Sequence, residues 1–141
     1  MWLLKRAFHN AHRSVNEAVR PYGITPTQMG ALRRLMDEPG LSGAELARRL
    51  LVTPQAAQLA VSSLERQGLV ERTPDPGHGR IVRTSVTTEG RRVMRSCLPR
   101  AHTAETAFLS VLDDDARDAL IHALQVLAQP TDDPVGDVKD L

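Results

Sequence analysis

The sequence predicts a mainly α-helical chain that carries one small β-hairpin. Aromatic residues make up only 3% of the 141 residues, and a core of Leu, Val and Ala favours packed helices over a β-sandwich. Several segments repeat their apolar residues at steps of three and four, which is the period of a helix. After Gly68 the period changes to that of a strand, so the hairpin is expected in the middle of the chain.

Charge is distributed unevenly, although the net charge is only +1. Residues 1–112 hold sixteen Lys and Arg against nine acidic residues, whereas residues 113–141 hold eight Asp against Arg117 and Lys139. A basic body followed by an acidic end is typical of a chain that binds phosphates and ends in a solvated tail. Solvated helix faces are the alternative explanation. We expect residues 129–141 to form a flexible acidic tail.

Neither a membrane span nor a signal peptide is predicted. No run of 18 apolar residues occurs, and the first ten residues place apolar side chains before basic ones, the reverse of a secretory signal. We therefore expect a cytoplasmic protein without a membrane partner. Cys97 is the only cysteine, and its helical neighbours favour a packed or interface residue over a redox sensor.

The first predicted helix, residues 2–20, carries a narrow apolar stripe. Its members recur at alternating steps of four and three. A helix with such a stripe must bury it against later helices or against a second subunit. The stripe consists of Leu4, Phe8, Ala11, Val15 and Ala18.

Three helix starts follow, each with recognisable capping chemistry. The sequences TPTQ at residues 25–28 and SGAE at residues 42–45 are capping boxes, and Thr53-Pro54 combines a cap with a proline at the first helical position. The third helix is expected to end at Gly68. Because only Leu51-Val52 separates the last two helices, they must cross steeply, as in a helix-turn-helix.

The segment after Gly68 predicts a hairpin with a long tip. Residues 69–73 and 81–86 have strand character, and residues 74–80 between them are rich in turn formers. A long hairpin beside a helix-turn-helix is a wing. The predicted fold is therefore a winged helix-turn-helix lobe over residues 25–87.

Two helices complete the predicted fold. Thr87-Thr88 caps a helix that runs to Leu112, in which Pro99 should cause a kink or a local break. Residues 113–115, all Asp, suit the N-terminus of a last helix. Together with the first helix they place the whole fold within residues 1–128.

Two segments resemble the MarR family of bacterial transcription regulators, residues 23–55 (GITPTQMGALRRLMDEPGLSGAELARRLLVTPQ) and residues 64–90 (LERQGLVERTPDPGHGRIVRTSVTTEG). The resemblance implies a homodimer held by helices within residues 1–22 and 88–128. It also implies that two winged lobes bind a double-stranded DNA operator, and that a small molecule relieves the repression of nearby genes.

Two positions depart from the family pattern. The family usually has an acidic residue two positions before the wing arginine, where this chain has His78, and a second arginine in the recognition helix, where this chain has Leu59. His78 replaces the acidic partner of the family's usual wing salt bridge. Leu59 is expected to affect the strength and the sequence preference of DNA binding. The alternative function is a winged-helix dimer that serves as a protein-interaction module or binds DNA without sequence preference.

The helix from Pro54 to Arg66 is predicted to enter the major groove. Ala57, Val61 and Leu64 fall on its inner face. On the outer face, Gln55 and Gln58 are expected to pair with adenine, and Ala56 or Leu59 to contact a thymine methyl group. A solvated helix face is the alternative for this segment taken alone. The predicted recognition residues are Thr53, Pro54, Gln55, Ala56, Gln58, Leu59 and Ser62.

The wing and the helix caps are predicted to supply the remaining DNA contacts. Arg80 at the wing tip would enter the minor groove, where the potential is negative. Arg72 and Arg83 would hold phosphates, with His78 beside them at the tip. Ser42, like Thr53, is a further phosphate candidate, with helix capping as its alternative role.

No catalytic, cofactor or metal site is predicted, because the sequence offers neither a nucleophile–base pair nor a Gly-rich phosphate loop. His9 and His12 lack an acidic or sulfur ligand at a diagnostic spacing, which favours a solvated or interface pair. The family resemblance implies an effector pocket between the lobe and the dimer helices. Its predicted lining is Phe8, His12, Tyr22 and Met36, for which plain core packing is the alternative.

Overall fold

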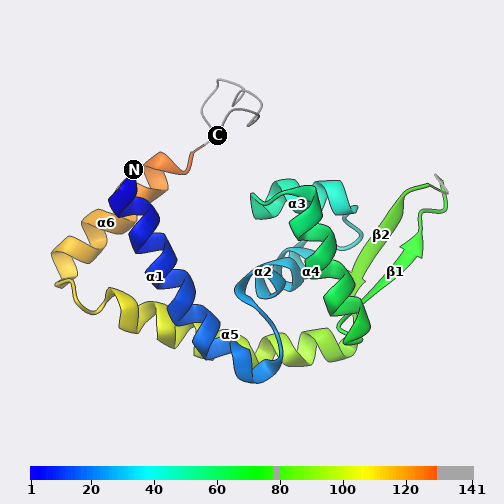
Figure 1. Ribbon diagram of the computed structural model, residues 1–141, viewed down its shortest axis with the longest axis horizontal. Helices are drawn as coiled ribbons and strands as arrows, with labels where there is room; N and C mark the ends of the chain where they lie inside the picture. Colours follow the sequence, from blue (N-terminus) through cyan, green and yellow to red (C-terminus); the bar gives the residue numbers. More distant parts are fainter. Residues whose placement is uncertain (78–79, 130–141) are drawn as a thin grey trace. The chain divides into compact units, whose positions relative to one another are not determined.

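The computed structural model describes residues 1–77 and 80–129, and it confirms a mainly helical chain with one antiparallel hairpin (Figure 1). Contacts divide the chain into two units, residues 1–108 and residues 109–141. His78, Gly79 and the predicted tail from residue 130 onward lie outside the described residues. The elements are α1 (Trp2–Val19), the 3-10 turn η1 (Arg20–Tyr22), α2 (Pro26–Asp37), α3 (Gly43–Leu50), α4 (Pro54–Arg66), β1 (Val70–Pro74), β2 (Val82–Val86), α5 (Thr88–Leu109) and α6 (Asp114–Leu127).

The predicted caps are present at the starts of α2, α3 and α4. Thr25 Oγ1 accepts from the Gln28 N–H at 3.2 Å, and Gln28 Oε1 accepts from the Thr25 N–H at 2.8 Å. Ser42 and Glu45 form the same reciprocal pair. Each box satisfies two backbone donors that a helix start leaves free. These helix starts are therefore determined by residues only three positions apart.

The turn between α3 and α4 is as short as predicted. Leu51 ends α3 in the left-handed region, with φ of 53°, and its side chain is 93% exposed. Its N–H donates to the carbonyl groups of Ala47 and Arg48, which terminates the helix. Thr53 then caps α4, and its Oγ1 accepts from the Ala56 N–H at 3.1 Å.

One hydrophobic core runs through residues 1–108. Leu32 and Leu35 of α2, Leu46 of α3 and Leu64 of α4 are fully buried. The same cluster includes residues of α1, of the hairpin and of α5, so the lobe is not packed separately from these two long helices. The contributions from those elements are Val15, Val19, Leu69, Val70, Val86, Val93, Met94, Cys97 and Ala101.

The hairpin is hydrogen-bonded to the segment before α3 as well as between its own strands. Its strands pair from Val70 with Val86 to Pro74 with Val82, within one residue of the predicted strand starts. Thr84 of β2 also bridges to the segment before α3, donating to the Leu41 carbonyl and accepting from the Gly40 N–H, each at 3.1 Å. The wing is therefore hydrogen-bonded to the helix-turn-helix beside it.

The first turn of α5 packs closely against the base of the hairpin. Thr87 Oγ1 donates to the Gly68 carbonyl at 2.7 Å and accepts from the Gly90 N–H at 3.1 Å. A Cβ atom on Gly90 would lie 2.1 Å from the Leu69 carbonyl oxygen, so the approach requires glycine.

The end predicted for α5 was wrong, because the helix ends at Leu109 instead of Leu112. Of the two outcomes predicted for Pro99, a kink or a local break, the break does not occur. Pro99 and Arg95, whose carbonyl loses its helical donor to the proline, are both exposed. Water can hydrate that carbonyl, so the helix continues through the proline.

The second unit consists of α6 and its flanking residues. Asp113 caps the helix, with Oδ1 accepting from the Ala116 N–H at 2.8 Å, as the acidic run predicted. No residue of α6 is buried. Within residues 1–77 and 80–129, no helix combines the length and hydropathy that a membrane span requires.

Candidate nucleic-acid interface

The two faces of α4 differ as predicted. Ala57, Val61 and Leu64 are buried against the lobe. The opposite face exposes Gln55, Gln58 and Leu59, the last of them 72% exposed. Thr53 and Pro54 are exposed at the N-terminal end of the helix, and Ala56 and Ser62 are half-buried. Figure 1 shows α3 crossing α4 and the hairpin standing beside them.

A small polar network connects β1 to the outer face of α4. Arg72 Nη2 donates to Ser62 Oγ at 2.8 Å, and Arg72 Nε lies 3.1 Å from Glu65 Oε2. Gln58 Nε2 donates to the same Ser62 oxygen at 3.4 Å. The Ser62 hydroxyl is therefore shared: it accepts from Arg72 of β1 and from Gln58, which is predicted to bind adenine.

A second network connects β2 to the start of α3. Arg83 Nε donates to Asp75 Oδ2 at 2.7 Å, and Nη1 donates to Glu45 Oε2 and to the Gly40 carbonyl, each at 3.2 Å. The hydrogen bond to Asp75 is the main reason that the pKa of Arg83 is raised. The pKa of Glu45 is lowered, first by the hydrogen bonds from Ser42 and then by the charge of Arg83.

The predicted phosphate-binding residues are in different states. Arg72 and Arg83 are paired with carboxylates of the chain itself, and their side chains are only 22% and 34% exposed. Ser42 donates to Glu45 at 2.6 Å and serves as a helix cap. Arg80 is exposed and pairs with no carboxylate in the part of the chain that the structure describes. The role of each residue in DNA contact stays a prediction, which for His78 concerns a residue outside the described ranges.

Asp75 is a site residue that the sequence analysis missed. Its Oδ1 accepts from the Gly77 N–H at 2.7 Å while Oδ2 binds Arg83. An acidic residue at the start of the wing loop was the available signal, but nothing in its spacing identified an arginine eight positions later as the partner.

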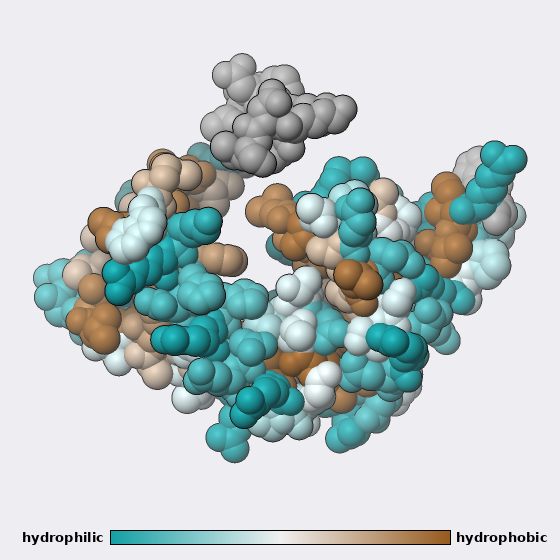
Figure 2. Space-filling model, in the orientation of Figure 1, coloured by the Kyte–Doolittle hydropathy of each residue, from teal (hydrophilic) through white to brown (hydrophobic). Residues whose placement is uncertain are grey.

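The surface around α4 is mixed in character. Figure 2 shows brown patches among hydrophilic ones at the α3–α4 turn, on α4 and on the hairpin. The exposed apolar residues of these elements include Leu51, Leu59 and Val82. A face with both glutamines and apolar groups offers contacts for base edges and for thymine methyl groups.

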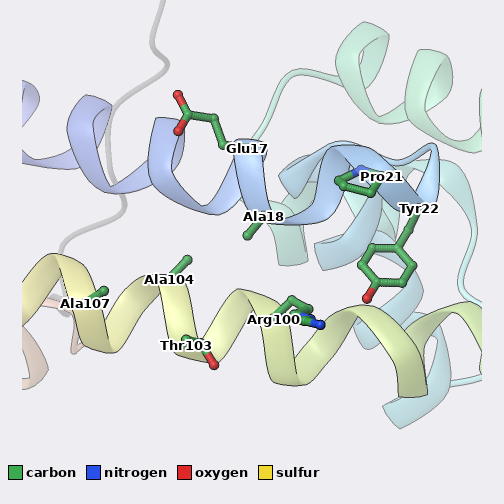
Figure 3. Close-up of a pocket in the computed structure, with 8 residues that line it drawn as sticks. All are labelled: Glu17, Ala18, Pro21, Tyr22, Arg100, Thr103, Ala104 and Ala107. Carbon is green, nitrogen blue, oxygen red and sulfur yellow. The ribbon is translucent and has the colours of Figure 1, made fainter.

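A separate pocket of about 470 Å³ lies between α1–η1 and α5. In Figure 3 the Tyr22 hydroxyl is directed toward α5, and Glu17 points away from that helix. The pocket is lined by Glu17, Ala18, Pro21, Tyr22, Arg100, Thr103, Ala104 and Ala107.

Of the four residues predicted for an effector pocket, only Tyr22 lines this one. Phe8 is 69% exposed, and its ring centroid lies 5.9 Å from that of His12 on the exposed part of α1. Met36 packs against the core. The helix period placed Phe8 on the predicted apolar stripe, but its side chain is exposed within the first unit.

Cys97 is a packed residue, as predicted. It is fully buried, and burial raises the pKa of its thiol, which disfavours the thiolate that a redox sensor uses. Among the described residues, no group of three or more His, Cys, Asp or Glu side chains lies close enough to hold a metal ion.

A helix-turn-helix whose second helix exposes a polar face, with an antiparallel hairpin beside it, defines a winged helix-turn-helix protein. A model of the MarR family matches residues 22–81. Over 111 residues the chain is 34% identical to the HTH-type transcriptional repressor Rv2887 of Mycobacterium tuberculosis, which covers 79% of this chain and 80% of the relative. The chain belongs to the MarR family of transcription regulators. This confirms the predicted class of protein, which is a non-enzymatic regulator.

Solved structures agree with this assignment. The Mycobacterium tuberculosis MarR family protein Rv2887 in complex with salicylic acid has a TM-score of 0.73 and 32% identity, covering 89% of this chain and 93% of that one. The transcriptional repressor CouR bound to a 23-mer DNA duplex has a TM-score of 0.82 and 29% identity, covering 91% of each chain.

Proposed function

We propose that this chain is a cytoplasmic, homodimeric repressor that binds double-stranded operator DNA and is released by a small aromatic acid. The observation that carries the proposal is the outer face of α4, which is exposed, polar and hydrogen-bonded to the wing. The relatives support it, since Rv2887 is described as a repressor and CouR has been solved with a DNA duplex.

In the proposed complex each copy places α4 in a major groove. Gln55 and Gln58 pair with adenine, and Ala56 or Leu59 meets a thymine methyl group. The start of α4 at Thr53-Pro54 lies against the backbone, and Arg80 enters the minor groove. Two α4 helices about 34 Å apart would occupy successive turns of one face of the duplex.

Exposed apolar side chains support the dimer. Both α1 and α6 carry such groups, and a soluble chain rarely leaves so many uncovered without a partner surface. A second copy, packed through residues 1–22 and 88–128, would cover them. The exposed residues are Trp2, Leu3, Leu4 and Phe8 on α1, and Leu120, Ile121, Leu124, Val126 and Leu127 on α6.

The pocket between α1–η1 and α5 is our candidate effector site. Its volume of about 470 Å³ is within the range of small-molecule sites. Arg100 supplies a positive charge for a carboxylate and Tyr22 supplies a hydroxyl group, whereas the Thr103 hydroxyl donates to the Pro99 carbonyl at 2.9 Å. An acid of the size of salicylic acid, which Rv2887 binds in its solved complex, matches this lining.

Selection from a randomised duplex library, followed by fluorescence anisotropy with competitor DNA, tests the DNA-binding part. The protein should enrich one sequence, and replacing Gln55 and Gln58 by Ala should reduce discrimination about fivefold or more at each base pair they contact. Gln67→Ala, at the far end of the same helix, is the control. Equal selectivity in all variants would contradict the assignment, and enrichment of no sequence would favour the nonspecific binder.

Salicylic acid tests the effector part. It should weaken binding of the wild-type protein to the enriched duplex, because a ligand that favours one spacing of the two α4 helices shifts the population away from the other. Arg100→Gln should remove this response, whereas Arg95→Gln, also exposed on α5 but outside the pocket, should keep it. An unchanged response in Arg100→Gln would exclude this pocket.

A further inference from the structure

We propose that Arg72 and Ser62 are positioning residues, which hold the Gln58 amide in place for base recognition before DNA binds. The inference rests on the proposed function in one respect, namely that the outer face of α4 contacts bases. It gives Arg72 a different role from the phosphate contact that the sequence suggested.

The geometry that carries this inference is a chain of hydrogen bonds with the Ser62 hydroxyl at its centre. Ser62 Oγ accepts from Arg72 Nη2 at 2.8 Å and from Gln58 Nε2 at 3.4 Å. Glu65 holds the other side of the guanidinium, with Oε2 at 3.1 Å from Arg72 Nε. Because Gln58, Ser62 and Glu65 follow at steps of four and three, they share one side of α4.

The Gln58 amide oxygen also lies near the first turn of α3. A Cβ atom at Gly43 in that turn would lie 4.0 Å from Gln58 Oε1. One amide hydrogen is used by Ser62, which leaves the second hydrogen and the oxygen for the N7 and N6 groups of adenine.

Holding this side chain in advance has an energetic consequence. A free glutamine has several rotamers, and fixing one of them on binding opposes association. Where Arg72 and Ser62 already fix the amide, that entropy is lost during folding and not during recognition. The wing strand then contributes to base selectivity although its arginine points at the protein.

Gln55 provides an internal comparison. It lies three residues earlier on the same exposed face, but it makes no side-chain hydrogen bond within the described residues. Loss of Arg72 or Ser62 should therefore affect the base pair read by Gln58 and leave the one read by Gln55 unchanged.

The test uses the full-length protein and the duplex that the wild-type chain enriches from a randomised library, together with all single base-pair substitutions of that duplex. Gln55→Ala and Gln58→Ala first identify the base pair that each glutamine reads. Arg72→Met and Ser62→Ala are then expected to reduce discrimination about twofold to tenfold at the Gln58 base pair alone. Neither variant should add to the loss in a Gln58→Ala background.

Salt dependence separates positioning from phosphate contact. If Arg72 is a positioning residue, Arg72→Met should leave the slope of log affinity against log salt unchanged, whereas a lost phosphate contact makes this negative slope shallower by about 0.9 per site. Arg80→Met provides the comparison on the same wing, where a shallower slope is expected. A shallower slope in Arg72→Met, or an equal loss of affinity at every base pair, overturns the inference.

Unfolding midpoints in urea control for damage to the fold. Should Arg72→Met be too unstable to test, Ser62→Ala decides the question alone, since it removes the central hydroxyl and leaves the Arg72–Glu65 pair. A Ser62→Ala profile identical to wild type overturns the inference while the proposed function stands. A wild-type protein that enriches no duplex overturns the proposed function itself.

Discussion

The winged lobe and α6 differ in how far one chain completes their packing. In the lobe, Leu32, Leu35, Leu46 and Leu64 are fully buried. In α6 no residue is buried, and Leu127 is 75% exposed. The lobe therefore has a well-buried core, which it shares with α1 and α5, whereas the described residues of the second unit leave an apolar face of α6 uncovered. The difference indicates that the lobe should fold independently of protein concentration, and that α6 should depend on association.

The largest expected effect is loss of core packing in the lobe. Leu64→Ala should lower the free energy of unfolding by about 2–5 kcal/mol, because it leaves a cavity in a close-packed core. Leu59→Ala, on the exposed face of the same helix, should change it by less than about 0.5 kcal/mol. Urea unfolding measures both values. Similar costs for the two variants would show that α4 does not have distinct inner and outer faces.

The next largest effect concerns the close contact between α5 and the base of the hairpin. Gly90→Ala should destabilise the protein by about 1–3 kcal/mol, because its Cβ would fall 2.1 Å from the Leu69 carbonyl oxygen. Gly43→Ala, whose Cβ would meet only Gln58 Oε1 at 4.0 Å, should be neutral or stabilise by about 0.5 kcal/mol. Thermal unfolding of the pair measures the difference. A neutral Gly90→Ala would mean that α5 can move away from the hairpin.

Association provides the test on the α6 side of the comparison. The double variant Leu124→Asp, Leu127→Asp should raise the dissociation constant of the dimer about tenfold or more, since each leucine loses apolar contact worth more than about 1 kcal/mol. Leu51→Asp, at a more exposed leucine in the lobe, is the control. Sedimentation equilibrium gives the constants. A wild-type monomer at micromolar concentration would contradict the proposed dimer.

The smallest effect is the pH dependence of the α3 cap. The folded state lowers the pKa of Glu45 below its usual 4.5. This carboxylate therefore stabilises the fold above about pH 4.5, and the contribution is lost as the pH falls through the lower pKa of the folded state. Glu45→Gln should make unfolding less sensitive to acid while keeping a side chain that can cap. Urea midpoints between about pH 7 and pH 3 test this. An equal acid sensitivity in the variant would exclude the Glu45 carboxylate as a source of the pH dependence of stability.

The parts of the fold that the sequence predicted well depend on short-range chemistry. The caps at Thr25, Ser42 and Thr53 involve partners three positions away, and the strand period after Gly68 lies within one segment. The inner face of α4 follows from helix periodicity alone. Such features can be derived from a single sequence because the interacting groups are near each other in the chain.

The parts that were missed depend on contacts between distant residues. Arg72 binds a hydroxyl ten positions earlier and Arg83 a carboxylate 38 positions earlier, so both arginines seemed free for phosphates in the sequence. The predicted roles of Phe8 and Met36 in an effector pocket stay predictions, because the surroundings of their elements are set by tertiary packing. Family resemblance supplied the class of protein, but it could not supply these partners.

Cys97 makes the interior of the first unit accessible to a chemical measurement. Its thiol is shielded by the core cluster that also holds Val15 and Val19 of α1, and thiolate formation is disfavoured there. Alkylation by a maleimide can then proceed only during transient local opening. The labelling rate of this thiol, the only one in the sequence, therefore reports how often that part of the native structure opens locally, without any engineered probe.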